Sequence, residues 1–153
     1  MKHPALIGVL MLAACSNPDH ALLDDRRIVG DSIPEALADR PGDAARGEQV
    51  FAGRDQGHCV LCHVVSHLDV PFQGNIGPDL SRVANRLSPS QLRLRIVDYQ
   101  IAVPGALMPS YYRIHDLYQV EQEYLGETIL SAQQVEDLVA YLSERGGEAD
   151  DNG

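Results

Sequence analysis

The chain of 153 residues has the length of a single domain. Its formal net charge is −10 and Lys2 is its only lysine, which excludes nucleic-acid binding through a basic surface and a phosphate loop that ends in lysine. Aromatic residues make up 5% of the chain, with no Trp, so the core is either aliphatic or completed by a group that is not protein.

The first fifteen residues have the layout of a secretory signal. A weakly basic start is followed by an apolar run over residues 5–14. The segment that ends at Cys15 also resembles the lipobox of bacterial lipoproteins, in which this cysteine carries the lipid anchor. The alternatives are a periplasmic protein tethered to the membrane through Cys15 and ordinary cleavage near residues 14–16; both predict export. No apolar run approaches the roughly 20 residues that cross a bilayer.

The rest of the chain divides into three parts by its pattern. Residues 16–42 are rich in proline-containing turns and are predicted to form an N-terminal extension, partly ordered against the domain. Residues 43–146 are predicted to form the domain. Residues 147–153 are acidic and are predicted to be a disordered tail.

Three helices are predicted within the domain. The first begins at Asp43, ends near Gly53 and has one apolar face, formed by Gly47, Val50 and Phe51. The second begins with the capping box Ser88–Gln91 and runs to about Gln100. Its apolar residues form two stripes, which predicts burial on more than one side: Leu92, Ile96 and Tyr99; Leu94, Val97 and Ile101.

The third helix begins with a second capping box, Ser131–Gln134, and is predicted to stop at Gly146-Gly147. Its apolar residues have helical spacing: Val135, Leu138, Val139 and Leu142. Residues 54–87 and 102–130 are predicted to be irregular. The chain shows no strand-like alternation of any length, so the predicted fold class is mainly α.

The decisive motif is Cys59-Val60-Leu61-Cys62-His63, the Cys-x-x-Cys-His pattern of c-type haem attachment. Two thiols at this spacing can reach the two vinyl groups on one edge of a porphyrin. The next residue, His63, is then placed under the iron as its proximal ligand. One copy of the motif predicts one covalently bound haem c, which would also fill a core poor in aromatic residues.

Three other interpretations of the cysteine pair are weaker. A thioredoxin-like redox pair requires a βαβ setting that the pattern lacks, and a zinc site requires further cysteines. A structural disulfide would close a loop too short to stabilise a domain. Haem attachment is therefore preferred.

The sixth ligand of the iron has several candidates. Met108 is the one methionine that remains after the signal, and it precedes a proline in a predicted loop. His58 and His67 are close in sequence to His63 and cannot easily cross to the opposite haem face. His20, His115 and an open or otherwise liganded iron remain as alternatives. Met108 is preferred, and a thioether opposite an imidazole favours ferrous iron, as suits an electron acceptor.

Gly77-Pro78 follows the haem motif. This pattern resembles class I cytochromes c, and the resemblance implies a class I cytochrome c fold in which the Pro78 carbonyl accepts a hydrogen bond from the proximal histidine. The other interpretation of Gly77-Pro78 is a simple turn.

Three longer segments carry a narrower resemblance. Residues 75–81, the segment Met108-Pro109-Ser110-Tyr111-Tyr112-Arg113 and residues 129–142 together resemble the SoxX family, over roughly residues 43–145. SoxX is the monohaem subunit of the SoxAX cytochromes, which oxidatively join thiosulfate to a cysteine of a carrier protein. The resemblance implies Cys59 and Cys62 as haem attachment sites and His63 and Met108 as axial ligands.

The resemblance also implies a division of labour. The catalytic haem of the family belongs to the SoxA partner, and the SoxX haem takes electrons away to a downstream acceptor. The chain has no spare cysteine or acid–base pair beside its motif, so its own role is predicted to be redox. The alternative is a stand-alone electron shuttle. The lipobox-like signal departs from the family's freely periplasmic location.

Overall fold

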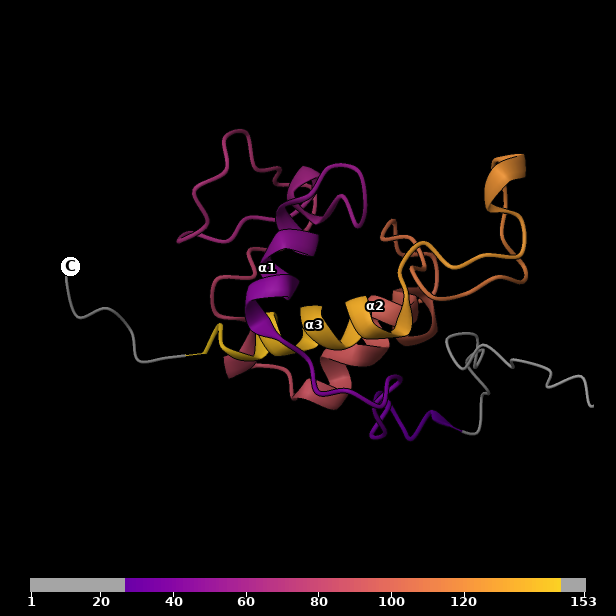
Figure 1. The fold of residues 1–153 in the computed structure, drawn as a ribbon, viewed down its shortest axis with the longest axis horizontal. Coiled ribbons are helices and arrows are strands. Elements are labelled where there is room, and N and C mark those ends of the chain that lie inside the picture. The colour runs from indigo at the N-terminus through magenta and orange to yellow at the C-terminus, as the bar shows by residue number, and fades with distance from the viewer. Residues whose placement is uncertain (1–26, 147–153) are drawn as a thin grey trace, which may run out of the picture.

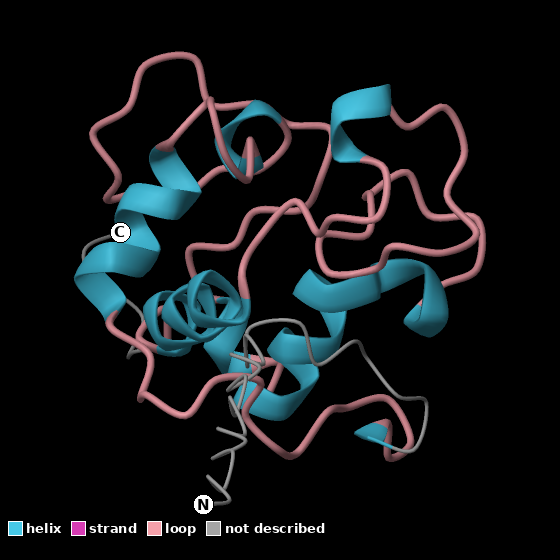
Figure 2. Ribbon diagram, turned by 45° about the vertical axis from the view of Figure 1, so that its right-hand side comes forward, coloured by secondary structure: helices cyan, strands magenta, loops and turns pink. Residues whose placement is uncertain are grey.

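The computed structural model describes residues 27–146. Three helices are joined by long loops: α1, Ala44–Ala52; α2, Pro89–Ala102; and α3, Ala132–Ser143 (Figures 1 and 2). Three short 3-10 turns interrupt the loops: η3, Cys59–Leu61; η4, Val83–Asn85; and η5, Gln122–Tyr124. Residues 27–146 form no strand, only an isolated bridge between Val29 and Ser32, so the predicted mainly α class is confirmed.

Several of the predictions fall outside residues 27–146. These are the signal with Cys15, the first part of the extension and the acidic tail. Within the part that is described, no helix has the length and apolar character needed to span a membrane.

Local sequence signals set where the helices begin. The Asp43 side chain accepts a hydrogen bond from the backbone of Arg46 at the start of α1. Both predicted capping boxes are formed at the starts of α2 and α3. Helix α3 ends at Ser143, before the predicted stop at Gly146. Just after the helix, the guanidinium of Arg145 lies 4.4 Å from the centre of the Tyr141 ring.

Helix α2 is buried on more than one side, as its two stripes predicted, but its last turn differs. Asp98 leaves the helical conformation, with φ −159° and ψ 93°. The kink turns the end of the helix, and Ile101 is 41% exposed, so its predicted place in a buried stripe is wrong. Asp98 itself is fully buried.

Helices α1 and α3 pack against each other closely, with α1 crossing α3 in Figure 1. Gly47 makes this possible, because a Cβ at that position would lie 2.0 Å from the carbonyl oxygen of Asp137. The rings of Phe51 and Tyr141 meet in the same interface, with centroids 5.5 Å apart. A side chain at Gly47 would therefore push the two helices apart.

A salt bridge closes the edge of this interface. Arg46 donates two hydrogen bonds of 2.8 Å to the carboxylate of Asp137, which also accepts from the Asp43 backbone. Burial acts to raise the pKa of Asp137. The hydrogen bonds from Arg46, Gln133 and Asp43 outweigh it, and the pKa lies below its ordinary value.

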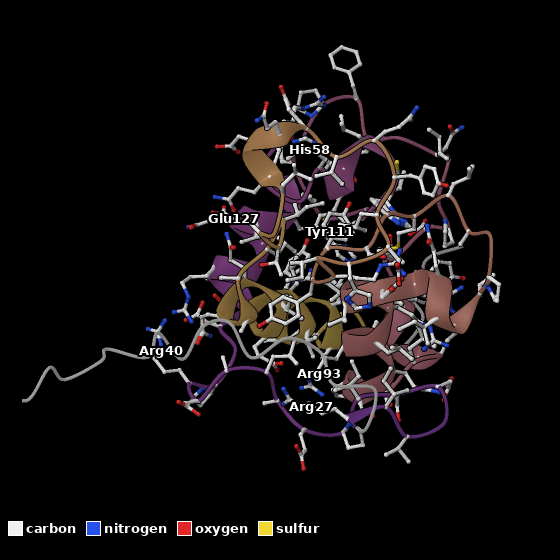
Figure 3. The ribbon with its side chains drawn as sticks, turned by 90° about the vertical axis from the view of Figure 1, so that its right-hand side faces the viewer. Arg27, Arg40, His58, Arg93, Tyr111 and Glu127 are labelled. Atoms are coloured by element: carbon white, nitrogen blue, oxygen red, sulfur yellow. The ribbon has the colours of Figure 1, made fainter. Side chains whose placement is uncertain are left out.

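A second, buried salt bridge holds the segment before α1. Arg93 in α2 bonds Glu136 in α3 at 2.7 and 2.8 Å and also donates to the carbonyl of Ile33. Glu136 accepts from the Leu37 backbone, and the Ile33 side chain is fully buried. Figure 3 places Arg93 beside the segment that begins at Arg27. The segment around Ile33 and Leu37 is thus fastened to α2 and α3.

We expect Asp137→Asn to destabilise the protein by about 1–3 kcal/mol at pH 7, because charge-assisted hydrogen bonds to Arg46 are lost. The pKa of Asp137 is lower in the folded state than in the unfolded state. The contribution of Asp137 to the free energy of unfolding is therefore complete above the unfolded pKa of about 4 and is lost as the pH falls through the folded pKa. Guanidinium unfolding of the wild type and the variant should therefore differ at pH 7 and converge in strong acid. Exposed Asp39→Asn is the control, and equal stabilities of Asp137→Asn and wild type at pH 7 would contradict the account.

Candidate functional site

An apolar cleft lies where the three helices and the loops meet. It contains about 320 Å³ of space that protein atoms do not fill. Each helix contributes to its apolar wall, as do two loops: Phe51, Leu80, Ile96, Leu130, Leu138 and Leu142. The wall also carries four residues with heteroatoms in their side chains: Cys59, His63, Met108 and Tyr111.

The cysteine motif folds into a tight turn that faces the cleft. The backbone amides of Cys62 and His63 both bond the carbonyl of Cys59, at 3.1 and 2.9 Å. This turn brings Cys59 and His63 to the cleft wall. The Cys62 side chain is half-buried. Cys59 and Cys62 are free thiols, so the disulfide interpretation is not supported.

The electrostatics of the cleft reflect its apolar character. Burial raises the pKa of the Cys59 thiol to about 12. Burial likewise raises the pKa of Tyr111 above its ordinary value. Redox-active cysteine pairs have lowered pKa values, so this environment does not favour a thioredoxin-like function. Residues 27–146 also contain no group of three or more His, Cys, Asp or Glu residues able to hold a metal ion, as a zinc site would require.

His63 is held by the residues that follow the motif. Its Nδ1 lies 2.8 Å from the carbonyl oxygen of Pro78. A carbonyl can only accept, so Nδ1 carries the proton and the neutral ring keeps the Nε2 lone pair for a metal. This is the contact predicted for Pro78, and it matches the way metal-bound histidines are oriented in proteins.

Gly77 is a further part of this arrangement, with a packing role that the sequence analysis did not assign to it. A Cβ at Gly77 would lie 2.3 Å from Cε1 and 2.6 Å from Nδ1 of His63. The Gly77 amide also donates to the Cys62 carbonyl at 2.8 Å. The backbone at Gly77 therefore packs directly against the imidazole, and any side chain would displace it. Only the Gly-Pro pair itself signalled this in the sequence.

Met108 and His115 are placed differently. Met108 is half-buried in the loop after α2 and lines the same cleft as His63. His115 is exposed and does not line the cleft. Tyr111, which the sequence did not single out as a site residue, also lines the cleft and is buried; it is labelled in Figure 3.

The residues around the cleft fit a haem. A flat apolar macrocycle matches the aliphatic walls, and a nitrogen donor and a thioether are ligands that haem iron accepts. Cys59 and Cys62 lie at the two ends of one turn directly before His63, the spacing that covalent attachment requires. The shortage of protein aromatics in the sequence is consistent with a core completed by such a group.

Comparisons with known proteins agree with this geometry. The family model for cytochrome c matches residues 44–145, and the chain belongs to the cytochrome c family. The family implies covalently bound haem c. No curated protein matches the chain significantly.

Among solved structures, the chain is similar to the crystal structure of SoxXA from P. pantotrophus. The TM-score is 0.72 at 29% sequence identity, and the match covers 78% of this chain and 93% of that chain. With the family match, this likeness supports a SoxX-type cytochrome, as the sequence resemblance predicted, and a class I cytochrome c fold.

We expect Gly77→Ala to destabilise the haem-loaded protein by about 3 kcal/mol or more, because its methyl group overlaps the His63 ring. Thermal unfolding of the holoprotein, followed by haem absorbance, measures the effect. Gly53→Ala is the control, because a Cβ there lies 3.1 Å from its nearest neighbours and φ is −65°. A Gly77→Ala protein as stable as Gly53→Ala would show that the backbone does not press on the imidazole.

Proposed function

We propose that this chain is an electron-transfer subunit that binds one haem c through Cys59 and Cys62. The observation that carries the proposal is the cleft wall, on which Cys59, His63 and Met108 come together from two separated segments. His63 would be the proximal and Met108 the distal ligand of the iron. When bound, the haem would supply one-electron chemistry, and the thioether of Met108 would favour its reduced state.

The protein's own residues prepare the site for this role. Pro78 fixes the tautomer of the His63 ring, while the missing side chain at Gly77 leaves the space that the ring occupies. The walls of the cleft are mainly apolar, and with haem in place they would limit the access of water to the iron. A fixed imidazole and an apolar surround would keep both oxidation states in nearly the same geometry, which suits rapid electron transfer.

The partner is inferred from the likeness to SoxXA. We propose that the chain forms a complex with a SoxA-like cytochrome and passes its electrons to a downstream acceptor. The complex would join thiosulfate to a cysteine of a carrier protein. Forming this sulfur–sulfur bond releases the thiol proton and a pair of electrons, and the electrons leave through this chain.

The sulfur chemistry itself is assigned to the partner. Among the described residues of this chain, the cysteines are Cys59 and Cys62, and the proposed attachment occupies both. No thiol is then left in this part of the chain to hold a sulfur intermediate. We also propose export to the periplasm, directed by residues 1–15, with a tether to the membrane through Cys15.

The functional proposal predicts that reduction of this haem by thiosulfate requires the other components. Purified chain, SoxA-like cytochrome, carrier protein and thiosulfate are mixed, and haem reduction is followed by absorbance as each component is omitted in turn. We expect fast reduction only in the complete mixture. Equally fast reduction of the isolated chain by thiosulfate would refute the subunit assignment and favour a stand-alone electron shuttle.

A further inference from the structure

Asp98 is a fully buried carboxylate inside α2, at the point where the helix is kinked. Its backbone is extended, and its Oδ1 accepts a hydrogen bond of 3.1 Å from the amide of Gln100. These are the features of a helix N-cap, so Asp98 restarts the last turn of α2. A buried carboxylate is costly unless other groups pair with it.

The other partners of Asp98 come from the segment after Met108. The hydroxyl of Ser110 donates to Oδ1 of Asp98 at 2.7 Å. A guanidinium nitrogen of Arg113 lies 2.9 Å from Oδ2. Both oxygens of one buried carboxylate are thus directed at the loop that carries Met108.

At the kink, a backbone carbonyl of α2 also accepts hydrogen bonds from the same loop. The carbonyl of Val97, next to Asp98, accepts from the amides of Tyr111 and Tyr112 at 3.1 and 3.2 Å. On the other side of Met108, the side chain of Gln100 contacts the carbonyl of Ala106 at 3.4 Å. Both flanks of Met108 are therefore fastened to the end of α2.

We propose that Asp98 is a positioning residue that holds the thioether of Met108 toward the iron. This inference rests on the proposed role of Met108 as distal ligand. The loop is in equilibrium between a closed state and an open state that frees the ligand position, and the contacts of Asp98 favour the closed state. Because imidazole can bind the ferric iron only in the open state, its apparent affinity measures this equilibrium.

The test is Asp98→Asn in the haem-loaded protein. Asparagine can still accept from Ser110 and Gln100 but carries no charge opposite Arg113. We expect a weaker red absorption band from the thioether on ferric iron. We also expect imidazole to bind about tenfold more tightly, because the ion pair between Asp98 and Arg113 is lost.

Asp137→Asn is the matched control. Asp137 is a buried carboxylate bonded to an arginine, like Asp98, but it joins α1 to α3 and does not contact the Met108 loop. The Asp137→Asn variant should have a lower free energy of unfolding than the wild type but the same red band and the same imidazole affinity. If both variants shift imidazole affinity equally, the effect is general destabilisation and the positioning role is overturned.

Two further variants keep the result decisive. Ser110→Ala removes one hydrogen bond to Asp98 but leaves the ion pair with Arg113. We expect this variant to shift the imidazole affinity in the same direction as Asp98→Asn but by less, and it can be measured even if Asp98→Asn does not fold. An unchanged imidazole affinity in Ser110→Ala would overturn the inference.

Met108→Ala tests the ligand assignment separately and should abolish the red band. If the band persists in Met108→Ala, the ligand assignment fails. If it disappears there but Asp98→Asn binds imidazole like the wild type, only the positioning role fails.

Discussion

The hydrogen bond from His63 to the Pro78 carbonyl is the interaction around which the site is arranged. It fixes the imidazole in one plane and one tautomer, so that Nε2 points away from Pro78 with its lone pair free. Gly77 allows this contact because its backbone lies against the ring where a Cβ would not fit. In the proposed function, this orientation would set where the iron lies and therefore how far the thioether of Met108 must reach.

Two ion pairs with buried carboxylates join the helices of this protein. Arg93 and Glu136 join α2, α3 and the segment around Ile33, while Arg46 and Asp137 join α1 to α3. Such pairs contribute little net stability over apolar packing, but each one is satisfied only in one arrangement of the helices. The cleft can therefore keep its shape with walls built mainly of aliphatic side chains.

The features that could be predicted from the sequence are those that depend on residues close together along the chain. Asp43, Ser88 and Ser131 cap helices through partners three residues away, and the haem motif lies within a single turn. The kink at Asp98 could not be predicted, since its partners Ser110 and Arg113 belong to a loop without a periodic pattern. The fit of Gly77 against His63 and the pairing of Arg93 with Glu136 likewise depend on tertiary contacts.

The central claim is that the cleft holds one haem bonded to both cysteines, and a mass measurement on the exported protein tests it most directly. After denaturation in acid–acetone, the polypeptide should retain the mass of one haem, and a variant with Cys59→Ser and Cys62→Ser should retain none. Haem that is extracted from the wild-type chain by this treatment would contradict the account.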